Sequence, residues 1–411
     1  MNKIELIKAS AGSGKTHELM DRLSECIASG TRPEGLLATT FTVKAAAELQ
    51  SRIRQKLLEG ASPELAARVF DGLIGTVNGV CGKLLNEYAI EAGLSPALDV
   101  LPDENADAIF SAATSAAMEE YAGKLENIAS RLSLNPMKEK LYGKTLDWKK
   151  DVREILNLAR SNRLSKADLT ACGERSAAAL EKVFPATVNL SLDDISKQVV
   201  ACGNFKAMGT ATKKTVENIR SFLRFPTWAG ACQLANAAYA KTIDTEFPIG
   251  VFEEIRRKLL CSRELYEDMA SMIRSVFACA GRSLEEYAKY KEAFGLVDFV
   301  DQECGVLDLL EGKPNFFALM KGRLSQIMVD EFQDTSPIQL ALFLKLNECS
   351  RKGSVWVGDP KQAIYGFRGT DPELMEAVAK TISDPLLSGK NFSIGNRRKA
   401  PIVGVDSNLE A

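Results

Sequence analysis

The chain has 411 residues, and its 52 Lys and Arg nearly balance its 54 Asp and Glu, which leaves a formal net charge of −2. This length, with 45% hydrophobic residues, predicts a globular protein of two or three domains and excludes disordered and fibrous classes. The balanced charge excludes a global attraction to polyanions, so a nucleic-acid site would have to be a local patch.

The histidine and cysteine content excludes several kinds of chemistry. His17 is the only histidine of the chain, which excludes Ser/His/Asp hydrolysis, Cys/His proteolysis and metal sites built from histidines. The nine cysteines are scattered without a C-x-x-C pair, which is typical of reduced apolar residues. No apolar run is long enough to span a bilayer and no signal peptide is evident, so we expect a cytoplasmic protein without a membrane partner.

The first hundred residues alternate between strand and helix patterns. Residues 3–10 and 35–41 are short apolar runs that predict strands, and residues 14–29 and 42–60 have apolar residues at helical spacing. The apolar face of the second helix is expected to consist of Ala46, Leu49, Ile53 and Leu57. This alternation predicts an α/β fold with a parallel sheet.

The pattern changes in the middle of the chain. Residues 102–290 show long helical periods and predict an α-helical insertion subdomain, and strand patterns return at residues 326–334 and 354–360. The most basic stretches are residues 138–166 and 206–224, which predict either a solvated helix face or a patch for a polyanion.

The segment "ASAGSGKT" fits the pattern of a phosphate-binding P-loop between a strand and a helix. Small residues let successive backbone N–H groups point at phosphate, while Lys15 reaches the β- and γ-phosphates and Thr16 ligates Mg²⁺. The residues expected to bind ATP in this way are Ala9, Ser10, Ala11, Gly12, Ser13, Gly14, Lys15 and Thr16.

The segment "IMVDEFQDT" supplies the carboxylates that such a loop needs. An apolar strand would deliver Asp330 to the magnesium ion, and Glu331 beside it is the candidate base that orients the attacking water. An acidic strand end without a ligand is the alternative. It is disfavoured next to a P-loop, because hydrolysis of a phosphoanhydride needs a metal-binding carboxylate and a base together.

The segment "VWVGDPKQAIYGFRG" begins with a third apolar run, which predicts a strand. An amide, two aromatic rings and two cations come after this strand. Tyr365 and Phe367 could stack on unpaired bases while Lys361 and Arg368 hold phosphate, or the two rings could belong to the core. The residues taken alone favour the core.

These segments together resemble the UvrD/Rep/RecB-like superfamily 1 DNA helicases. The resemblance rests on "ASAGSGKT", "ATTFTVKAAAELQSRI", "GLIGTVNGVCGKLL", "GLVDFVD", "VDEFQDTSPIQ", "VGDPKQAIYGFRG" and "NRRKAPIV", which occur in the order typical of that family. The form of the P-loop so near the N-terminus is most similar to the RecB/AddA branch.

The resemblance implies further site residues. Gln362 would sense the γ-phosphate, Arg398 would act as an arginine finger, and Arg397 would pack on adenine where the family often has an aromatic ring. Asn78 stands where the family usually has His. The residues implied to contact DNA are Phe41, Thr42, Lys44, Thr76, Asn78, Tyr365, Phe367 and Arg368, with the aromatic rings stacked on bases.

The resemblance also implies an architecture. A RecA-like motor domain would occupy residues 1–101 and 291–380, the helical subdomain residues 102–290, and the start of a second motor domain residues 381–411. The motifs expected later in a second motor domain do not occur in these 411 residues.

The implied activity is that of an ATP- and Mg²⁺-dependent helicase. It would move 3′→5′ on single-stranded DNA, or on a duplex with a single-stranded end, in DNA repair or recombination, and a nuclease domain or partner subunit could accompany it. The alternative is an ATP-switched DNA-binding or regulatory protein that does not unwind. A P-loop kinase is disfavoured, because "DEFQDT" and "VGDPKQAIYGFRG" have no role in that chemistry.

Overall fold

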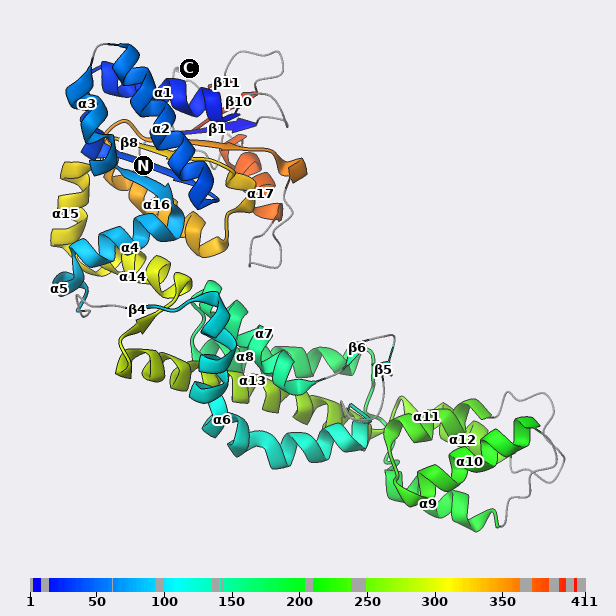
Figure 1. The fold of residues 1–411 in the computed structure, drawn as a ribbon. Coiled ribbons are helices and arrows are strands. Elements are labelled where there is room, and N and C mark those ends of the chain that lie inside the picture. Colours follow the sequence, from blue (N-terminus) through cyan, green and yellow to red (C-terminus); the bar gives the residue numbers. More distant parts are fainter. Residues whose placement is uncertain are drawn as a thin grey trace, which may run out of the picture. The chain divides into compact units, whose positions relative to one another are not determined.

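The computed structural model describes residues 3–8, 15–60, 62–93, 99–134, 140–141, 144–145, 147–203, 210–237, 249–362, 372–383, 392–396 and 403–404. The chain divides into two compact units (Figure 1). The first comprises Met1–Asn105, Ser161–Arg163 and Lys291–Ala411, and the second comprises Ala106–Arg160 and Leu164–Tyr290.

A seven-stranded sheet forms the centre of the first unit. Its strands are β1 (Ile4–Lys8), β2 (Leu36–Thr40), β3 (Leu73–Thr76), β8 (Gln326–Val329), β9 (Ser354–Gly358), β10 (Phe392–Asn396) and β11 (Val403–Gly404), in the order β11-β10-β1-β9-β8-β2-β3. All neighbouring strands are parallel except β10 and β11. A strand forms within each of the stretches predicted at residues 3–10, 35–41, 326–334 and 354–360, and the predicted parallel sheet is confirmed.

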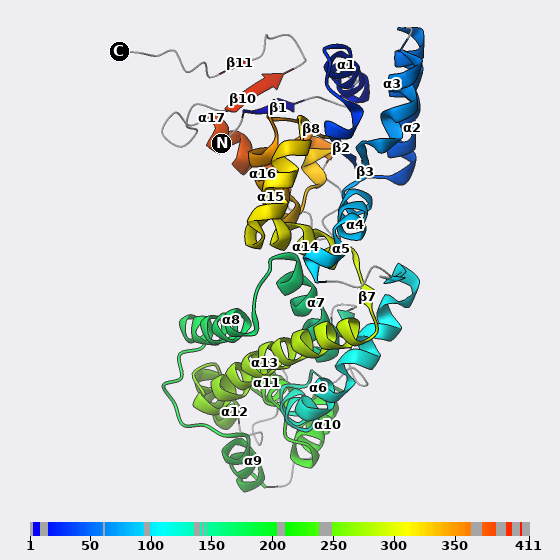
Figure 2. The ribbon, with the colours of Figure 1, turned by 90° about the vertical axis from the view of Figure 1, so that its left-hand side faces the viewer.

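Helices cover both faces of this sheet, as a parallel sheet requires. The helices of this unit are α1 (Lys15–Ala28), α2 (Val43–Glu59), α3 (Pro63–Ala67), α4 (Val77–Glu87), α5 (Ala89–Ala92), α14 (Phe299–Gly312), α15 (Pro314–Arg323), α16 (Pro337–Cys349) and α17 (Pro372–Ser383). Short 3₁₀ turns are η1 (Pro33–Gly35), η2 (Arg68–Asp71), η4 (Phe332–Asp334) and η5 (Pro360–Gln362). Figure 2 shows α1, α2 and α3 on one side of the sheet and α15, α16 and α17 on the other.

Two buried clusters hold the layers together. One lies under α1 and α2 and includes Leu49, Ile53 and Leu57 of α2. The predicted apolar face of α2 is confirmed, because these three residues and Ala46 are its buried residues. The other lies under α4, α14, α15, α16 and α17. A separate parallel ladder joins β4 (Asp99–Val100) to β7 (Leu296–Val297), and the sequence patterns did not predict it.

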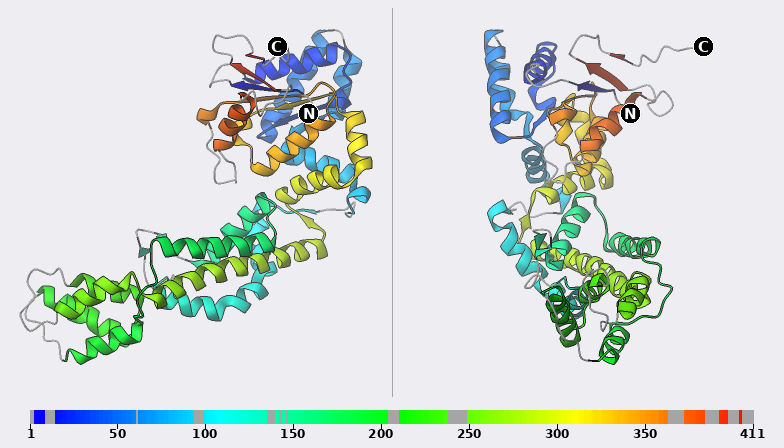
Figure 3. Two further views of the ribbon diagram at one scale, coloured as in Figure 1. Left: turned by 180° about the vertical axis from the view of Figure 1, so that it is seen from behind. Right: turned by 90° about the vertical axis from the view of Figure 1, so that its right-hand side faces the viewer.

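The second unit is mostly helical. Its elements are α6 (Asp103–Leu132), β5 (Lys140–Leu141), β6 (Lys144–Thr145), α7 (Trp148–Ser161), α8 (Lys166–Ala179), η3 (Leu180–Lys182), α9 (Leu192–Ala201), α10 (Thr210–Arg224), α11 (Trp228–Ala237), α12 (Ile249–Leu259) and α13 (Arg263–Ala293). One core cluster joins α6, α7, α8 and α13, and a second joins α9, α10, α11 and α12 near the beginning of α13 (Figure 3). Among the described helices, none is both long and apolar enough to cross a bilayer.

Carboxylates of the same unit engage part of the basic stretch 138–166. Arg153 pairs with Asp107, and the Lys166 ammonium lies 2.8 Å from Glu285. Arg160 instead lies over the ring of Tyr287, 5.1 Å from its centre. These contacts favour a solvated, ion-paired helix face for the described part of this stretch, and such surface pairs contribute little stability.

Gly353 is a position where the fold leaves no room for a side chain. Its φ is +82°, and a Cβ atom would lie 2.1 Å from the Lys3 carbonyl oxygen. We expect Gly353→Ala to lower the free energy of unfolding by about 3 kcal/mol, from backbone strain and overpacking. The exposed helical Gly322 has open space around it, so Gly322→Ala should raise that free energy by about 0.5–1 kcal/mol. Urea denaturation of both variants tests this, and equal stabilities would contradict it.

Candidate nucleotide and nucleic-acid site

The parallel strands bring their carboxyl ends to one edge of the sheet. The register pairs Lys8 with Gly358, Val329 with Trp356, and Thr40 with Thr76. The segments that directly follow these strands therefore share that edge, although they are far apart in sequence. Ligands of open parallel sheets bind at this edge.

The acidic end of β8 is fixed by backbone hydrogen bonds. The Asp330 N–H donates to the Thr39 carbonyl at 2.9 Å, and the Glu331 N–H donates to Asp330 Oδ1 at 3.0 Å. Asp330 is buried, whereas Glu331 is half-buried and has a φ of +52°. A non-glycine residue in this left-handed region costs about 1–2 kcal/mol, so the surroundings must hold Glu331 in place.

Gln333 connects this acidic end to the end of β9. Its Nε2 donates to Glu331 Oε2 at 2.7 Å and to Asp334 Oδ2 at 3.2 Å. Its Oε1 accepts from the Asp359 N–H at 2.8 Å. One buried amide therefore bridges the ends of two neighbouring strands.

The turn after β9 brings Gln362 to the same edge. The Gln362 N–H donates to the Asp359 carbonyl at 2.8 Å, and the Lys361 N–H donates to Asp359 Oδ1 at 3.1 Å. Glu331 and Gln362, which the sequence predicts to act on one phosphate, thus follow adjacent strands.

The carboxylate Asp330 suits Mg²⁺. This ion is commonly held by one or two carboxylates together with waters and phosphate oxygens of the substrate, rather than by a cage of protein ligands. Within the described ranges, no group of three or more His, Cys, Asp or Glu could hold a metal ion by itself. The donor chemistry therefore fits Mg²⁺ bound together with a phosphate ligand.

Two helices begin at the ends of β2 and β3. The Thr42 hydroxyl accepts from the Ala45 N–H at 3.1 Å, and the Thr76 hydroxyl accepts from the Gly79 N–H at 3.0 Å. Each threonine is the N-cap of its helix, α2 or α4. Unpaired N–H groups and the helix dipole make such N-termini favourable places for phosphate.

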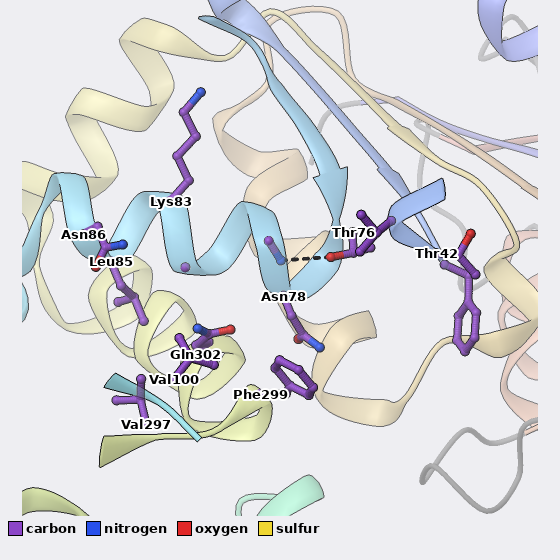
Figure 4. Close-up of a pocket in the computed structure, with 14 residues that line it drawn as sticks. Thr42, Thr76, Asn78, Lys83, Leu85, Asn86, Val100, Val297, Phe299 and Gln302 are labelled. Carbon is purple, nitrogen blue, oxygen red and sulfur yellow. Dashed lines mark hydrogen bonds between the residues drawn. The ribbon is translucent and has the colours of Figure 1, made fainter. Parts of the chain in front are cut away.

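A pocket of about 820 Å³ opens beside these two helix N-termini. It is lined by Phe41, Thr42, Val43, Thr76, Asn78, Gly79, Gly82, Lys83, Leu85, Asn86, Val100, Val297, Phe299 and Gln302. In Figure 4 the Asn78 amide points toward the ring of Phe299. The Asn78 Oδ1 atom is buried and accepts no hydrogen bond among the described residues.

The chain matches the UvrD/REP helicase N-terminal domain over residues 1–223 and 251–383. It belongs to this family. The resemblance predicted from the motifs is thereby confirmed.

The chain is also similar to curated proteins whose names describe one subunit of an ATP-dependent helicase/nuclease. That of Streptococcus agalactiae is 26% identical over 94% of this chain and 36% of the relative. The protein of Streptococcus mutans is 26% identical, over 94% of this chain and 35% of the relative. The protein of Lactobacillus acidophilus is 22% identical, over 90% of this chain and 35% of the relative. The chain thus spans about a third of the length of these relatives.

Part of the predicted site lies outside the described residues. These predicted positions are Ala9, Ser10, Ala11, Gly12, Ser13, Gly14, Tyr365, Phe367, Arg368, Arg397 and Arg398. Lys15 and Thr16 begin α1, but their side chains are likewise outside the described part. Of the described residues predicted to contact DNA, Phe41, Thr42, Thr76 and Asn78 line the pocket, and the exposed Lys44 does not.

The sequence analysis missed the wall of the pocket that α14 and the β4–β7 ladder provide. Phe299 and Gln302 come from α14, and Val100 and Val297 come from the ladder. The signal is present in "GLVDFVD", which contains Phe299 and belongs to the resemblance, but no residue role was assigned to it.

A buried carboxyl group connects this wall to α16. Glu303 is 4% exposed, and its Oε1 accepts from Gln339 Nε2 at 2.6 Å. Gln339 also forms a capping box with Ser336 at the start of α16, directly after the acidic end of β8. Burial raises the pKa of Glu303 to about 7, the Gln339 hydrogen bond opposes this shift, and Asp298 adds to it.

This pKa predicts how stability depends on pH. Because the folded chain holds the Glu303 proton up to about pH 7, against an ordinary value of 4.5, the folded state binds more protons within that window. The Glu303 contribution to stability is therefore present below pH 4.5 and is lost as pH rises toward 7. Glu303→Gln removes the titrating group, so the variant should gain stability relative to the wild type as pH rises.

Urea denaturation at pH 5 and pH 8 measures this change. The control is Glu91→Gln, because Glu91 is exposed at the surface of α5. Its difference from the wild type should be similar at the two pH values. A Glu303→Gln difference that does not change with pH would contradict the burial of an acidic proton at this position.

Proposed function

We propose that this chain is the ATP-binding portion of a UvrD/RecB-type DNA helicase, which couples ATP hydrolysis to 3′→5′ movement on single-stranded DNA in repair or recombination. The observation that carries the proposal is the shared sheet edge. It places Asp330, Glu331 and Gln362 after neighbouring strands, and it places a pocket with two helix N-termini along the same edge. The names of the relatives agree with ATP-driven work on DNA.

In the proposed reaction, the P-loop residues Ala9 to Thr16 hold the phosphates and Lys15 contacts the β- and γ-phosphates. Thr16 and Asp330 would hold Mg²⁺, which neutralises charge on the phosphate oxygens. Glu331 takes a proton from the attacking water, whose oxygen bonds to the γ-phosphorus while the bond to the β–γ bridging oxygen breaks. Gln362 contacts the γ-phosphate.

Two arginines are assigned by the resemblance. Arg398 would stabilise the charge that develops during transfer, and Arg397 would pack on adenine. The proposed DNA path begins at the helix N-termini, where Thr42, Lys44 and Thr76 hold backbone phosphates.

The pocket extends this path to the bases. Its Phe41 and Phe299 rings offer stacking surfaces, and the Asn78 and Gln302 amides offer hydrogen bonds to base edges. Asn78 lines the pocket, and its Oδ1 accepts no hydrogen bond among the described residues. Tyr365, Phe367 and Arg368 would continue the path.

The proposed architecture follows the same family pattern. A RecA-like motor domain comprises residues 1–101 and 291–380, residues 102–290 form its helical insertion, and residues 381–411 begin a second motor domain. A cytoplasmic location belongs to this proposal, and so does a nuclease domain or partner subunit, since the relatives' name includes a nuclease.

Nucleotide affinity tests the P-loop. Lys15→Ala removes a charged hydrogen bond to the phosphates, so we expect Mg·ATP affinity to fall about 10- to 100-fold. The matched control is Lys44→Ala, which removes a lysine from the start of the neighbouring helix α2. This control should keep ATP affinity and lose affinity for single-stranded DNA. Calorimetry measures both, and unchanged ATP affinity in Lys15→Ala would rule out the proposed nucleotide site.

Single-strand affinity tests the pocket. Loss of a stacking ring costs about 1–3 kcal/mol per base, so Phe299→Ala should weaken binding of an oligothymidine by that amount. Phe294 is a matched control, because it precedes the same helix, is 63% exposed and does not line the pocket. Phe294→Ala should bind like the wild type in a fluorescence anisotropy titration. Equal affinities of the two variants would remove the pocket from the DNA path.

A further inference from the structure

Gln333 uses both ends of its side-chain amide at the acidic edge of the sheet. It lies two residues after the proposed base and is 2% exposed. Its Nε2 donates to Glu331 and Asp334, and its Oε1 accepts from the Asp359 backbone. Burial without partners would cost several kcal/mol, so these bonds fix the position of the amide.

We propose that Gln333 is the positioning residue that orients the Glu331 carboxylate toward the attacking water and ties it to the turn that carries Gln362. This inference rests on the proposed function, because it assigns a role within the same nucleotide site. It adds a residue to which neither the motifs nor the resemblance gave a role.

The chemistry of the partners selects an amide at this position. A carboxylate needs a donor, and a backbone N–H needs an acceptor, so only a side chain with both can serve Glu331 and Asp359 together. A glutamate could still accept from Asp359 but would face two carboxylates without a donor. A methionine of similar length would serve neither partner.

The Gln333 amide oxygen packs closely against the end of β9. A Cβ atom on Gly358 would lie 2.8 Å from Gln333 Oε1, so the glycine at the end of β9 lets the amide oxygen approach the strand. Glu331 itself is held at a φ of +52°. The carboxylate therefore stands on a strained backbone, and the 2.7 Å bond from Gln333 restricts its orientation.

Two nucleotide-site residues are linked through this amide. Gln333 binds the Asp359 N–H, and the Asp359 carbonyl accepts the Gln362 N–H at 2.8 Å. If the γ-phosphate displaces the turn that carries Gln362, the Gln333 amide would shift with it. The Glu331 carboxylate, which this amide holds, would then change its position. Misplacement of a catalytic group by about 1 Å can lower a rate about 100-fold.

Binding of a transition-state analogue tests the proposal without turnover. The wild type should bind Mg·ADP with aluminium fluoride more tightly than Mg·ADP, because the analogue recruits the oriented base and water. Gln333→Met and Gln333→Glu should keep the ADP affinity within about threefold and lose about tenfold or more of the preference for the analogue. Where ATP turnover is measured, kcat should fall about 10- to 100-fold with little change in KM.

The matched control is Gln326, at the start of the strand that precedes the Gln333 turn. Gln326 is 6% exposed, begins β8, and donates to the Gly353 carbonyl at 3.3 Å. Gln326→Met therefore removes a buried amide from the same sheet, away from the carboxyl edge. It should lower the melting temperature as Gln333→Met does, yet retain the preference for the analogue.

Three results would overturn the proposal. In the first, both Gln333 variants prefer the analogue over Mg·ADP as strongly as the wild type does. In the second, the wild type binds Mg·ADP but shows no preference for the analogue. A loss of preference in Gln326→Met equal to that in Gln333→Met would also count against it, since the effect would then be structural. Unchanged ATP affinity in Lys15→Ala would instead mean that the proposed nucleotide site is wrong.

Discussion

The parallel pairing of β8 between β2 and β9 is the constraint on which the candidate site depends. The pairing of Thr39 with Val329 and of Val329 with Trp356 sets where each strand ends. The bond from the Asp330 N–H to the Thr39 carbonyl extends this pairing by one residue into the acidic segment. A register slip of one residue would reverse the face of every side chain in β8, and would move Asp330 and Glu331 relative to Gln362.

The sheet around β8 and the helix α2 could be predicted from the sequence, because the residues that the local patterns mark as apolar are the ones that are buried. The apolar face of α2 is buried as its helical spacing indicates, and β8 and β9 are buried throughout, as continuous apolar runs in a parallel sheet should be. Asp330 and Glu331 could be singled out as candidate site residues for a related reason. They directly follow an apolar run, which is a local pattern that the sequence shows. The parallel sheet then fixes the position of such residues at its carboxyl edge.

The rest depends on contacts between distant segments, which single-sequence patterns do not contain. The β4–β7 ladder pairs Asp99 with Leu296 in strands of only two residues, too short to give a periodic signal. The pocket wall needs this ladder and α14 together, so Phe299 and Gln302 could be noticed as part of a motif but not placed. The proposed role of Gln333 likewise follows from burial and hydrogen-bond partners that only three-dimensional coordinates supply. The resemblance, in contrast, already implies a DNA contact for Asn78.

The segment after β8 departs from the usual rule that polar residues are exposed. Asp330, Gln333 and Asp334 are all buried, although local composition would place such residues in a solvated turn. Phe332 explains how this is possible, since its ring stacks on Trp356 at 4.7 Å and anchors the turn in the core. The anchor forces the neighbouring polar side chains inward, where they must find partners in one another and in the end of β9. A fold that keeps several buried polar groups and a strained Glu331 at one strand end gives up stability there. A local loss of stability of this kind is expected where a site must hold charged groups in fixed positions. The backbone strain and the buried polar groups therefore indicate the same residues.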